Sequence, residues 1–530
     1  MTRFWKLALV CVGALVMRLV LLTFVVHPGI SDPNHYYNIG VQLARGNGYI
    51  VDYLWQFNNP PDTVVHPDDY NTPLTSYIAA APMALMGSLN VHTALALFIL
   101  IGSLLPIVGY GAAKQFRLSE TTCLFVAASV AFLPEFVLNS VRTDTTIPNA
   151  LLVCATILLL THGLQTGKWW AFALSGAMAG LAYLNRNDSS LLLPAFVLTL
   201  ALYALLRRRQ WIPSIRWRYV ALVPVVAALV FAPWILRNLT YSGSVATPNM
   251  ERMFFFTDYR DHYVYNGVFN LETMLERQTP LQLIGKRLFE MAASIKLMYT
   301  TLDMFLPVAV AGGLILLFAA RDRQRLIVLA PTLILLLGFF VFYTVLVPFK
   351  SQGGSFKKVY LTLVPLLLPL AGYALERAVT SHRLRAGAMA LATVFLAANA
   401  FEFVRADARF AASYLSRIQA MAAVAETLPD ANGDGEMVLM TQDPFMLSFV
   451  GIPSVLFPSD DRETVLEVAE RYGVDYLLMP PDRLELDALY YRTETDPRFT
   501  PVADVPGTEY VFYAIAPNAG QSRDDSAAAS

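Results

Sequence analysis

The 530-residue chain has little charge, few cysteines and no internal repeat. Charged residues make up 15% of it and the formal net charge is -1, which argues against nucleic acid as a partner. Its three cysteines, Cys11, Cys123 and Cys154, all fall in apolar runs, so we expect neither a disulfide framework nor a zinc site. Hydrophobic residues reach 56%. A soluble protein of this length would carry more charge, so the composition predicts a membrane protein.

Long apolar runs are what the chain has in abundance, and about 20 such residues cross a bilayer as a helix. We predict an all-α membrane fold with eleven spans: 6–26, 92–113, 119–138, 147–163, 169–185, 189–206, 219–237, 294–319, 326–346, 359–376 and 386–404. The first run is too long for a signal-peptide core, so we interpret it as a retained anchor. If the apolar segment 73–89 were a span, every later basic loop would lie on the opposite side of the membrane. We therefore interpret it as an interfacial helix beginning near Pro73.

Basic residues predict the orientation, because short cytoplasmic loops are rich in Lys and Arg. They crowd the N-terminus and alternate loops, most densely around 207–218, 321–325 and 377–385. This pattern places the N-terminus in the cytoplasm and the C-terminus outside. The short loops are typical of a bacterial inner (cytoplasmic) membrane. The long loops 27–91 and 238–293 are then extracytoplasmic, where long loops usually carry function.

The chain changes character after the last span. We predict a multi-span domain over 1–405, a soluble extracytoplasmic α/β domain over 406–520 and a disordered tail over 521–530. Within the soluble domain the patterns predict strands at 437–440, 452–457 and 474–479, helices at 443–450 and 462–471, and a hairpin of 499–505 with 510–515. Strands that alternate with helices favour a small parallel sheet.

Two outer aspartates are candidate catalytic residues. Asp32 opens a helix-like stretch that ends at Arg45-Gly46. It is either an ordinary N-cap followed by proline or a general base that removes a proton from an attacking hydroxyl, and the two roles are compatible. Asp144 lies in a short outer loop, where it is a solvated carboxylate, a partner of Arg142 or a second acid beside Asp32.

Other polar residues of the predicted outer face are candidate binding residues. Basic side chains there either snorkel to lipid headgroups or bind a lipid-linked phosphate, and they are Arg186, Arg237, Lys357 and Lys358. The first loop adds candidates for contact with an acceptor: His35, Tyr36, His66 and Asp69. His66 and nearby aspartates could hold a divalent cation, but no spacing matches a metal motif, so we predict no metal and favour a polar surface.

Several segments together resemble a known group. They are Ser31 to Tyr37, Ala44 to Tyr49, Tyr70 to Thr75, Asp144, Gly180 to Arg186 and Ala232 to Asn238. In order and on one face, they resemble the integral-membrane glycosyltransferases of the GT-C fold, most of all protein O-mannosyltransferases and lipid A aminoarabinose transferases. The resemblance covers roughly residues 1–400. It departs at Asp32-Pro33, where many protein mannosyltransferases have Asp-Glu, and at Lys357-Lys358, where arginine is common.

The resemblance implies a transferase that moves a sugar from a polyprenyl phosphate, with inversion, to a glycan, lipid or protein acceptor. Asp32 would be the base, Asp144 its neighbour, and the basic residues would bind the phosphate. Two rivals remain. A lipid or sugar carrier without chemistry would have its site near the bilayer midplane, and Arg18 in the first span favours it. A binding module on a membrane anchor would need far fewer spans.

Overall fold

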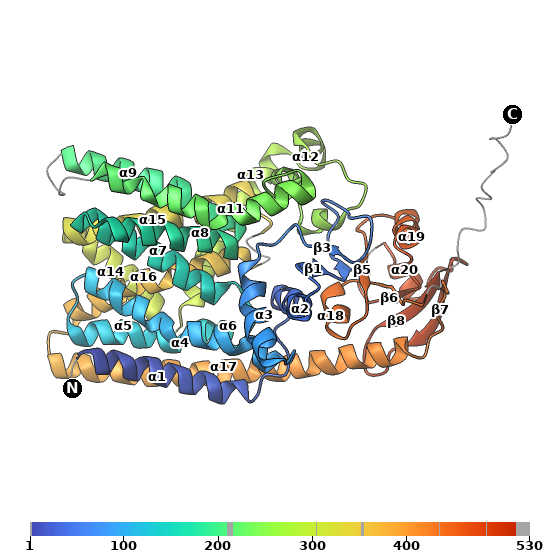
Figure 1. Ribbon diagram of the computed structural model, residues 1–530, viewed down its shortest axis with the longest axis horizontal. Helices are drawn as coiled ribbons and strands as arrows, with labels where there is room; N and C mark the ends of the chain where they lie inside the picture. Colours follow the sequence, from blue (N-terminus) through green and yellow to red (C-terminus); the bar gives the residue numbers. More distant parts are fainter. Residues whose placement is uncertain are drawn as a thin grey trace. The chain divides into compact units, whose positions relative to one another are not determined.

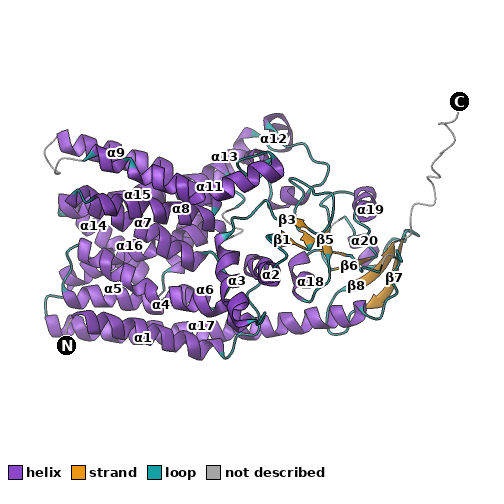
Figure 2. Cartoon of the chain, in the orientation of Figure 1, coloured by secondary structure: helices purple, strands orange, loops and turns teal. Residues whose placement is uncertain are grey.

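The computed structural model describes residues 3–208, 216–303, 305–350, 354–433, 435–483 and 485–515 (Figure 1). The described chain is mostly helical, and its strands gather in one region (Figure 2). It divides into two compact units. The first unit comprises 1–47, 69–259 and 271–411, and the second comprises 48–68, 260–270 and 412–530.

The first unit is a bundle of helices. Its elements are α1 (Arg3–Leu22), α2 (Asp32–Arg45), α3 (Leu74–Met86), α4 (Val91–Gln115), α5 (Glu120–Phe132), α6 (Pro134–Ser140), α7 (Thr146–Thr166), α8 (Trp169–Asn185), η1 (Asn187–Leu191), α9 (Leu192–Arg208), α10 (Trp217–Val220), α11 (Leu222–Ser242), η2 (Met250–Phe255), α12 (Leu271–Arg277), α13 (Pro280–Thr301), α14 (Leu306–Ala319), α15 (Arg323–Val341), η4 (Phe342–Leu346), α16 (Ser355–Ala378) and α17 (His382–Ala425). The helix α17 continues into the second unit.

Eight helical stretches of the described chain are long and apolar enough to cross a membrane, and two bent pairs raise the number to ten. This confirms an integral membrane protein with a helical bundle. The pairs are α5–α6, which is bent by 51°, and α13–α14. The first bend comes at Pro134, which has no N–H to continue the helix. The predicted span 294–319 is divided between α13 and α14, and the predicted span 169–185 is α8, which has 17 residues and is not among the helices counted as long enough to cross.

Two predicted helices of the first outer loop are confirmed. The helix α2 begins at Asp32 and ends at Arg45, where Gly46 takes the left-handed conformation that stops it. The helix α3 follows Pro73 and has 13 residues, about 20 Å, which is too short to cross a bilayer. Its position in the membrane interface stays a prediction.

The second unit contains two sheets. Its elements are β1 (Ile50–Val51), β2 (Tyr53–Leu54), β3 (His66–Pro67), η3 (Tyr259–Tyr263), β4 (Leu439–Thr441), α18 (Pro444–Phe449), β5 (Ser454–Leu456), α19 (Arg462–Arg471), β6 (Tyr476–Met479), α20 (Asp487–Tyr490), β7 (Phe499–Asp504) and β8 (Val511–Ile515). The larger sheet has the order β2-β5-β4-β6-β8-β7. The strands β4, β5 and β6 are parallel, as predicted, while β7 and β8 form the predicted antiparallel hairpin.

The sheet buries both faces. Alternate residues of β4 point to opposite sides, so Leu439 packs with the end of α17 and Met440 packs with α19. The sequence gives no signal for β2, because two residues of the first outer loop are too few for a strand pattern, yet β2 pairs with β5. The predicted tail 521–530 lies outside the described residues.

Candidate active site

Lys358 of α16 brings the two predicted aspartates together. Its Nζ lies 3.0 Å from a carboxylate oxygen of Asp32 and 2.6 Å from one of Asp144. We call these three residues the Lys358 cluster. Asp32 is 59% exposed, whereas Asp144 is 2% exposed. The cluster therefore has an open carboxylate and a buried one, which share a single cation.

The loops that carry the aspartates are tied to one another. The backbone N–H of Thr143 donates to the carbonyl oxygen of Pro28 at 3.1 Å, and the Thr143 hydroxyl donates to the carbonyl oxygen of Pro33. Gly29 has φ +115°, and a Cβ there would lie 2.6 Å from Pro33. Asp32 is the first residue of α2 and Ser31 is its N-cap, so the sequence-based N-cap assignment of Asp32 is off by one residue. The Asp32 carboxylate meets Lys358.

Charge and hydrogen bonding keep both aspartates ionised. The Lys358 ammonium is the largest influence on Asp32 and lowers the pKa of its carboxyl. Burial acts to raise the pKa of Asp144, but Lys358 and the hydroxyl and N–H of Thr146 outweigh it and lower that pKa to about 2. The Thr146 hydroxyl and N–H donate to Asp144 at 2.5 and 2.7 Å. Asp144 is thus a fixed anion, and Asp32 is an ionised carboxylate that is open to a ligand.

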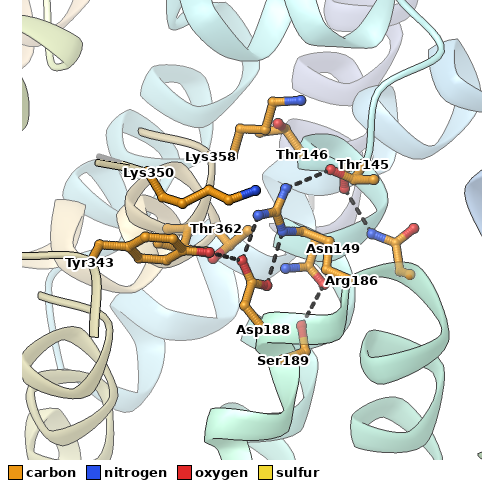
Figure 3. Close-up of polar contacts among 12 residues, drawn as sticks. Thr145, Thr146, Asn149, Arg186, Asp188, Ser189, Tyr343, Lys350, Lys358 and Thr362 are labelled. Carbon is orange, nitrogen blue, oxygen red and sulfur yellow. Dashed lines mark hydrogen bonds and ion pairs between the residues drawn. The ribbon is translucent and has the colours of Figure 1, made fainter. Parts of the chain in front are cut away.

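Arg186 is held in a second cluster (Figure 3). Its Nε and Nη2 donate to the two carboxylate oxygens of Asp188 at 3.0 and 2.5 Å, and its Nη1 donates to the hydroxyl of Thr145 at 3.0 Å. The hydroxyl of Tyr343 donates to Asp188 at 2.5 Å. We call these four residues the Arg186 cluster. Its bonds use three of the five N–H donors of the guanidinium, which leaves two for another group.

Lys350 is a basic residue that the sequence analysis missed. Its Nζ donates to the hydroxyl of Tyr70 at 2.9 Å and lies 5.6 and 5.9 Å from the ring centres of Tyr70 and Tyr259. In Figure 3 its ammonium points toward Arg186. No ion pair joins it to a carboxylate of the described residues. Lys350 lies in a predicted outer loop, whereas lysines are expected in cytoplasmic loops. This unusual position is the signal that could have identified it.

The other predicted basic residues have different surroundings. Lys357 makes an ion pair of 2.6 Å with Glu135 of α6. Arg237 stacks on the rings of Trp234 and Tyr241 at 4.7 and 5.1 Å and donates to Asn238 at 3.0 Å. The structure does not pair either one with the Lys358 cluster.

The predicted acceptor residues of α2 are linked through Asn71. The Asn71 amide nitrogen lies 2.8 Å from Nε2 of His35, and the Tyr36 hydroxyl donates to the Asn71 amide oxygen at 3.2 Å. Because an amide N–H only donates, this contact is a hydrogen bond when Nε2 of His35 is the acceptor. Both side chains are largely buried. They line the first turns of the helix that Asp32 opens.

The remaining candidates are placed elsewhere. His66 belongs to β3 in the second unit, where its Nδ1 lies 2.8 Å from the carbonyl oxygen of Val64. Asp69 belongs to the first unit, where its carbonyl oxygen accepts from the Thr247 hydroxyl at 2.9 Å. Within the described ranges no three His, Cys, Asp or Glu side chains gather in a way that could hold a metal ion.

Arg18 is fully buried in the first unit. Its Nη1 donates to the carbonyl oxygens of Ala14 and Ala131 at 3.1 and 3.0 Å. Ala131 lies in the last turn of α5, where the bend at Pro134 leaves carbonyl groups without a helical partner. Arg18 therefore caps the end of α5 through Nη1, whereas its buried Nε and Nη2 have no hydrogen-bond partner among the described residues.

Comparison with known proteins identifies the fold that carries this site. The family model for dolichyl-phosphate-mannose-protein mannosyltransferase matches residues 66–236. Among solved structures, ArnT from Cupriavidus metallidurans bound to undecaprenyl phosphate is similar with a TM-score of 0.58 and 16% identity, over 97% of this chain and 98% of that one. This chain has the GT-C fold. It resembles the mannosyltransferase and ArnT group within that fold.

A second GT-C structure extends the comparison. The Archaeoglobus fulgidus oligosaccharyltransferase is similar with a TM-score of 0.54 and 14% identity, over 91% of this chain and 69% of that one. No curated protein matches the sequence. Identities this low establish the GT-C fold alone, so the activity must be argued from the site.

Proposed function

We propose that this GT-C protein is an inverting glycosyltransferase that transfers a sugar from a polyprenyl phosphate to an acceptor hydroxyl. The observation that carries the proposal is the Lys358 cluster, in which an ionised, exposed carboxylate stands beside a buried anion and one shared cation. The similarity to a structure of ArnT with undecaprenyl phosphate supports the lipid-linked donor. We propose the outer face of a bacterial inner membrane, with the N-terminus in the cytoplasm, as its setting.

Asp32 is the general base of the proposed reaction. It accepts the proton of the acceptor hydroxyl while the oxygen attacks the anomeric carbon of the donor. The bond from that carbon to the phosphate oxygen breaks as the new bond forms, so a single displacement inverts the configuration. Asp144 holds Lys358 in place and does not itself take the proton, because its low pKa and its bonds to Thr146 keep it an anion.

The departing polyprenyl phosphate needs fixed cations. Lys350 serves best, because its partners are the hydroxyl of Tyr70 and two aromatic rings rather than a carboxylate of the described chain. Lys358 and the two remaining N–H donors of Arg186 complete the proposed phosphate site. Lys357 is neutralised by Glu135, and Arg237 is held by aromatic rings, so we assign both to its periphery. His35 and Tyr36 are proposed to contact the acceptor.

A donor panel tests the proposal. Purified protein in detergent receives radiolabelled polyprenyl-phosphate sugars, and release or transfer of the sugar is measured. We expect one donor to react and Asp32→Asn to lower the rate by at least about a hundred-fold, the usual contribution of a general base.

The matched control is Asp62→Asn, which changes a fully exposed aspartate of the second unit and should leave the rate unchanged. Melting temperatures show whether both variants fold. Full activity of a folded Asp32→Asn protein would rule out Asp32 as the base. Absence of turnover with every donor would favour the alternative function, a lipid or sugar carrier that catalyses no reaction.

A further inference from the structure

The loop that carries Asp144 makes one strong contact outside the Lys358 cluster. The guanidinium of Arg142 pairs with the carboxylate of Asp407 on α17, and both side chains are about one-quarter exposed. On sequence alone, Arg142 is one possible partner for Asp144, two residues away. The structure directs Arg142 to Asp407 instead, and Asp144 takes Lys358.

The stem of Arg142 also contacts the loop that leads to Asp32. A Cβ added at Gly29 would lie 3.2 Å from Cγ of Arg142, so the stem packs directly on this glycine. A small cavity behind the two loops is lined by His27, Gly29, Arg142 and Asp407 together with apolar residues of α17. Arg142 is therefore where three segments meet: the Asp32 loop, the Asp144 loop and α17.

The helix α17 lies beside the end of the first span. The rings of Phe24 and Phe401 pack edge to face with centres 6.1 Å apart. This packing gives Asp407 a rigid support, one turn beyond Phe403. The same helix continues to Ala425 and supplies residues to the core of the second unit.

We propose that Asp407 is a positioning residue of the active site, which through Arg142 sets the separation of the Asp32 and Asp144 loops. Arg142 fixes both loops at once, because Thr143 next to it is bonded to Pro28 and Pro33. The effect of Asp407 on kcat rests on the proposed function. Its effect on hydrogen exchange of the Asp144 loop rests on the structure alone.

The kinetic test compares Asp407→Asn with Asp407→Glu and with the exchanged pair Arg142→Asp/Asp407→Arg. We expect Asp407→Asn to lower kcat by about ten-fold to a hundred-fold, the effect of a small misplacement of reacting groups, with little change in the KM for the donor. Asp407→Glu should recover most of kcat, and the exchanged pair should recover part of it. The matched control is Glu402→Gln, which removes an exposed pair with Arg405 on the same helix and should leave kcat unchanged.

Hydrogen exchange tests the same inference without any activity. Amides of 141–146 should exchange several-fold faster in Asp407→Asn than in Glu402→Gln, because the Thr143 and Thr146 N–H bonds lose their support. Unchanged exchange or unchanged kcat in a folded Asp407→Asn protein would overturn the positioning role. If the wild type has no transferase activity but the exchange result holds, the proposed function fails while the link from α17 to the Asp144 loop stands.

Discussion

The Lys358 cluster and the Arg186 cluster use the same chemistry in opposite ways. In the Arg186 cluster one carboxylate, Asp188, receives two N–H bonds and a tyrosine hydroxyl, and it is 9% exposed. In the Lys358 cluster two carboxylates share one ammonium, and Asp32 is 59% exposed. The first group is neutral and closed. The second is negative by one charge and open.

The two clusters differ in whether a carboxylate can take part in the reaction. A carboxylate whose oxygens are already bonded cannot accept a proton from a substrate without breaking its support. Asp188 is such a group, so we assign its cluster to holding Arg186 and η1 in place. Asp32 has one oxygen bonded to a lysine that another carboxylate also binds, which leaves it free to act as a base.

The largest effect is expected when the shared cation is removed. Lys358→Met leaves Asp144 buried without its partner, a change that typically costs about 3–5 kcal/mol. Activity per folded molecule should fall at least about a hundred-fold, because the site also loses a cation that would bind the donor phosphate. Melting in detergent and the transfer rate measure the two effects.

The adjacent residue provides the control for this prediction. Lys357→Met removes an ion pair whose lysine is 37% exposed, and we expect a loss of no more than about 1 kcal/mol with the rate nearly unchanged. Equal losses in the two variants would mean that the lysine pair acts as a unit and that the Lys358 cluster has no special role.

Lys350 should affect donor binding rather than the proton transfer. In Lys350→Met the KM for the donor should rise about ten-fold, the value of one charge-assisted hydrogen bond, while kcat changes less. Lys350→Arg should keep part of the affinity. A fall in kcat with an unchanged KM would mean that Lys350 acts only on the charge that develops on the departing phosphate and not on the bound donor.

The pH dependence of the transfer rate follows from the lowered pKa values. Lys358 keeps the pKa of Asp32 below its usual 3.8, so the base is ionised throughout the neutral range. We expect kcat/KM to stay level from about pH 7 down to about pH 5 and to fall only near pH 4 or below. A half-maximal rate near pH 6 would contradict the assignment of Asp32 as the base.

The same shifts make a smaller prediction about stability. An aspartate with a lower pKa in the folded state stabilises the fold above its unfolded pKa, and this contribution is lost as the pH falls through the folded value. For Asp144 the loss should therefore occur between about pH 4 and about pH 2. Melting of the wild type across this range should show it, and Asp144→Asn should show less.

Much of this architecture could be predicted from the sequence, because its signals are local. The apolar runs, the helix from Asp32 to Gly46 and the strand-helix alternation after residue 437 each lie within a short window. The site is different, since Lys358 is 326 residues from Asp32 and 214 from Asp144. Charge on the predicted outer face identified all three residues. No local pattern indicates that the ammonium group of Lys358 contacts both aspartates. The strand β2 was missed because two residues form no strand pattern, whereas the only signal for Lys350 was a basic residue in a predicted outer loop.

A very small effect on activity is expected in the closed cluster. Tyr343→Phe removes the hydroxyl that donates to Asp188, and a hydrogen bond to a charged group contributes about 1.5–3 kcal/mol to stability. The melting temperature should fall, but kcat/KM of the folded protein should stay within about two-fold, because Arg186 keeps its two bonds to Asp188. The matched control is Tyr373→Phe, since the buried Tyr373 hydroxyl has no hydrogen-bond partner among the described residues and its loss should leave the melting temperature unchanged. A loss of activity in Tyr343→Phe as large as that in Lys358→Met would mean that Asp188 and Tyr343 themselves take part in the reaction, beyond holding Arg186 for the phosphate, and the contrast between an open and a closed carboxylate would no longer hold.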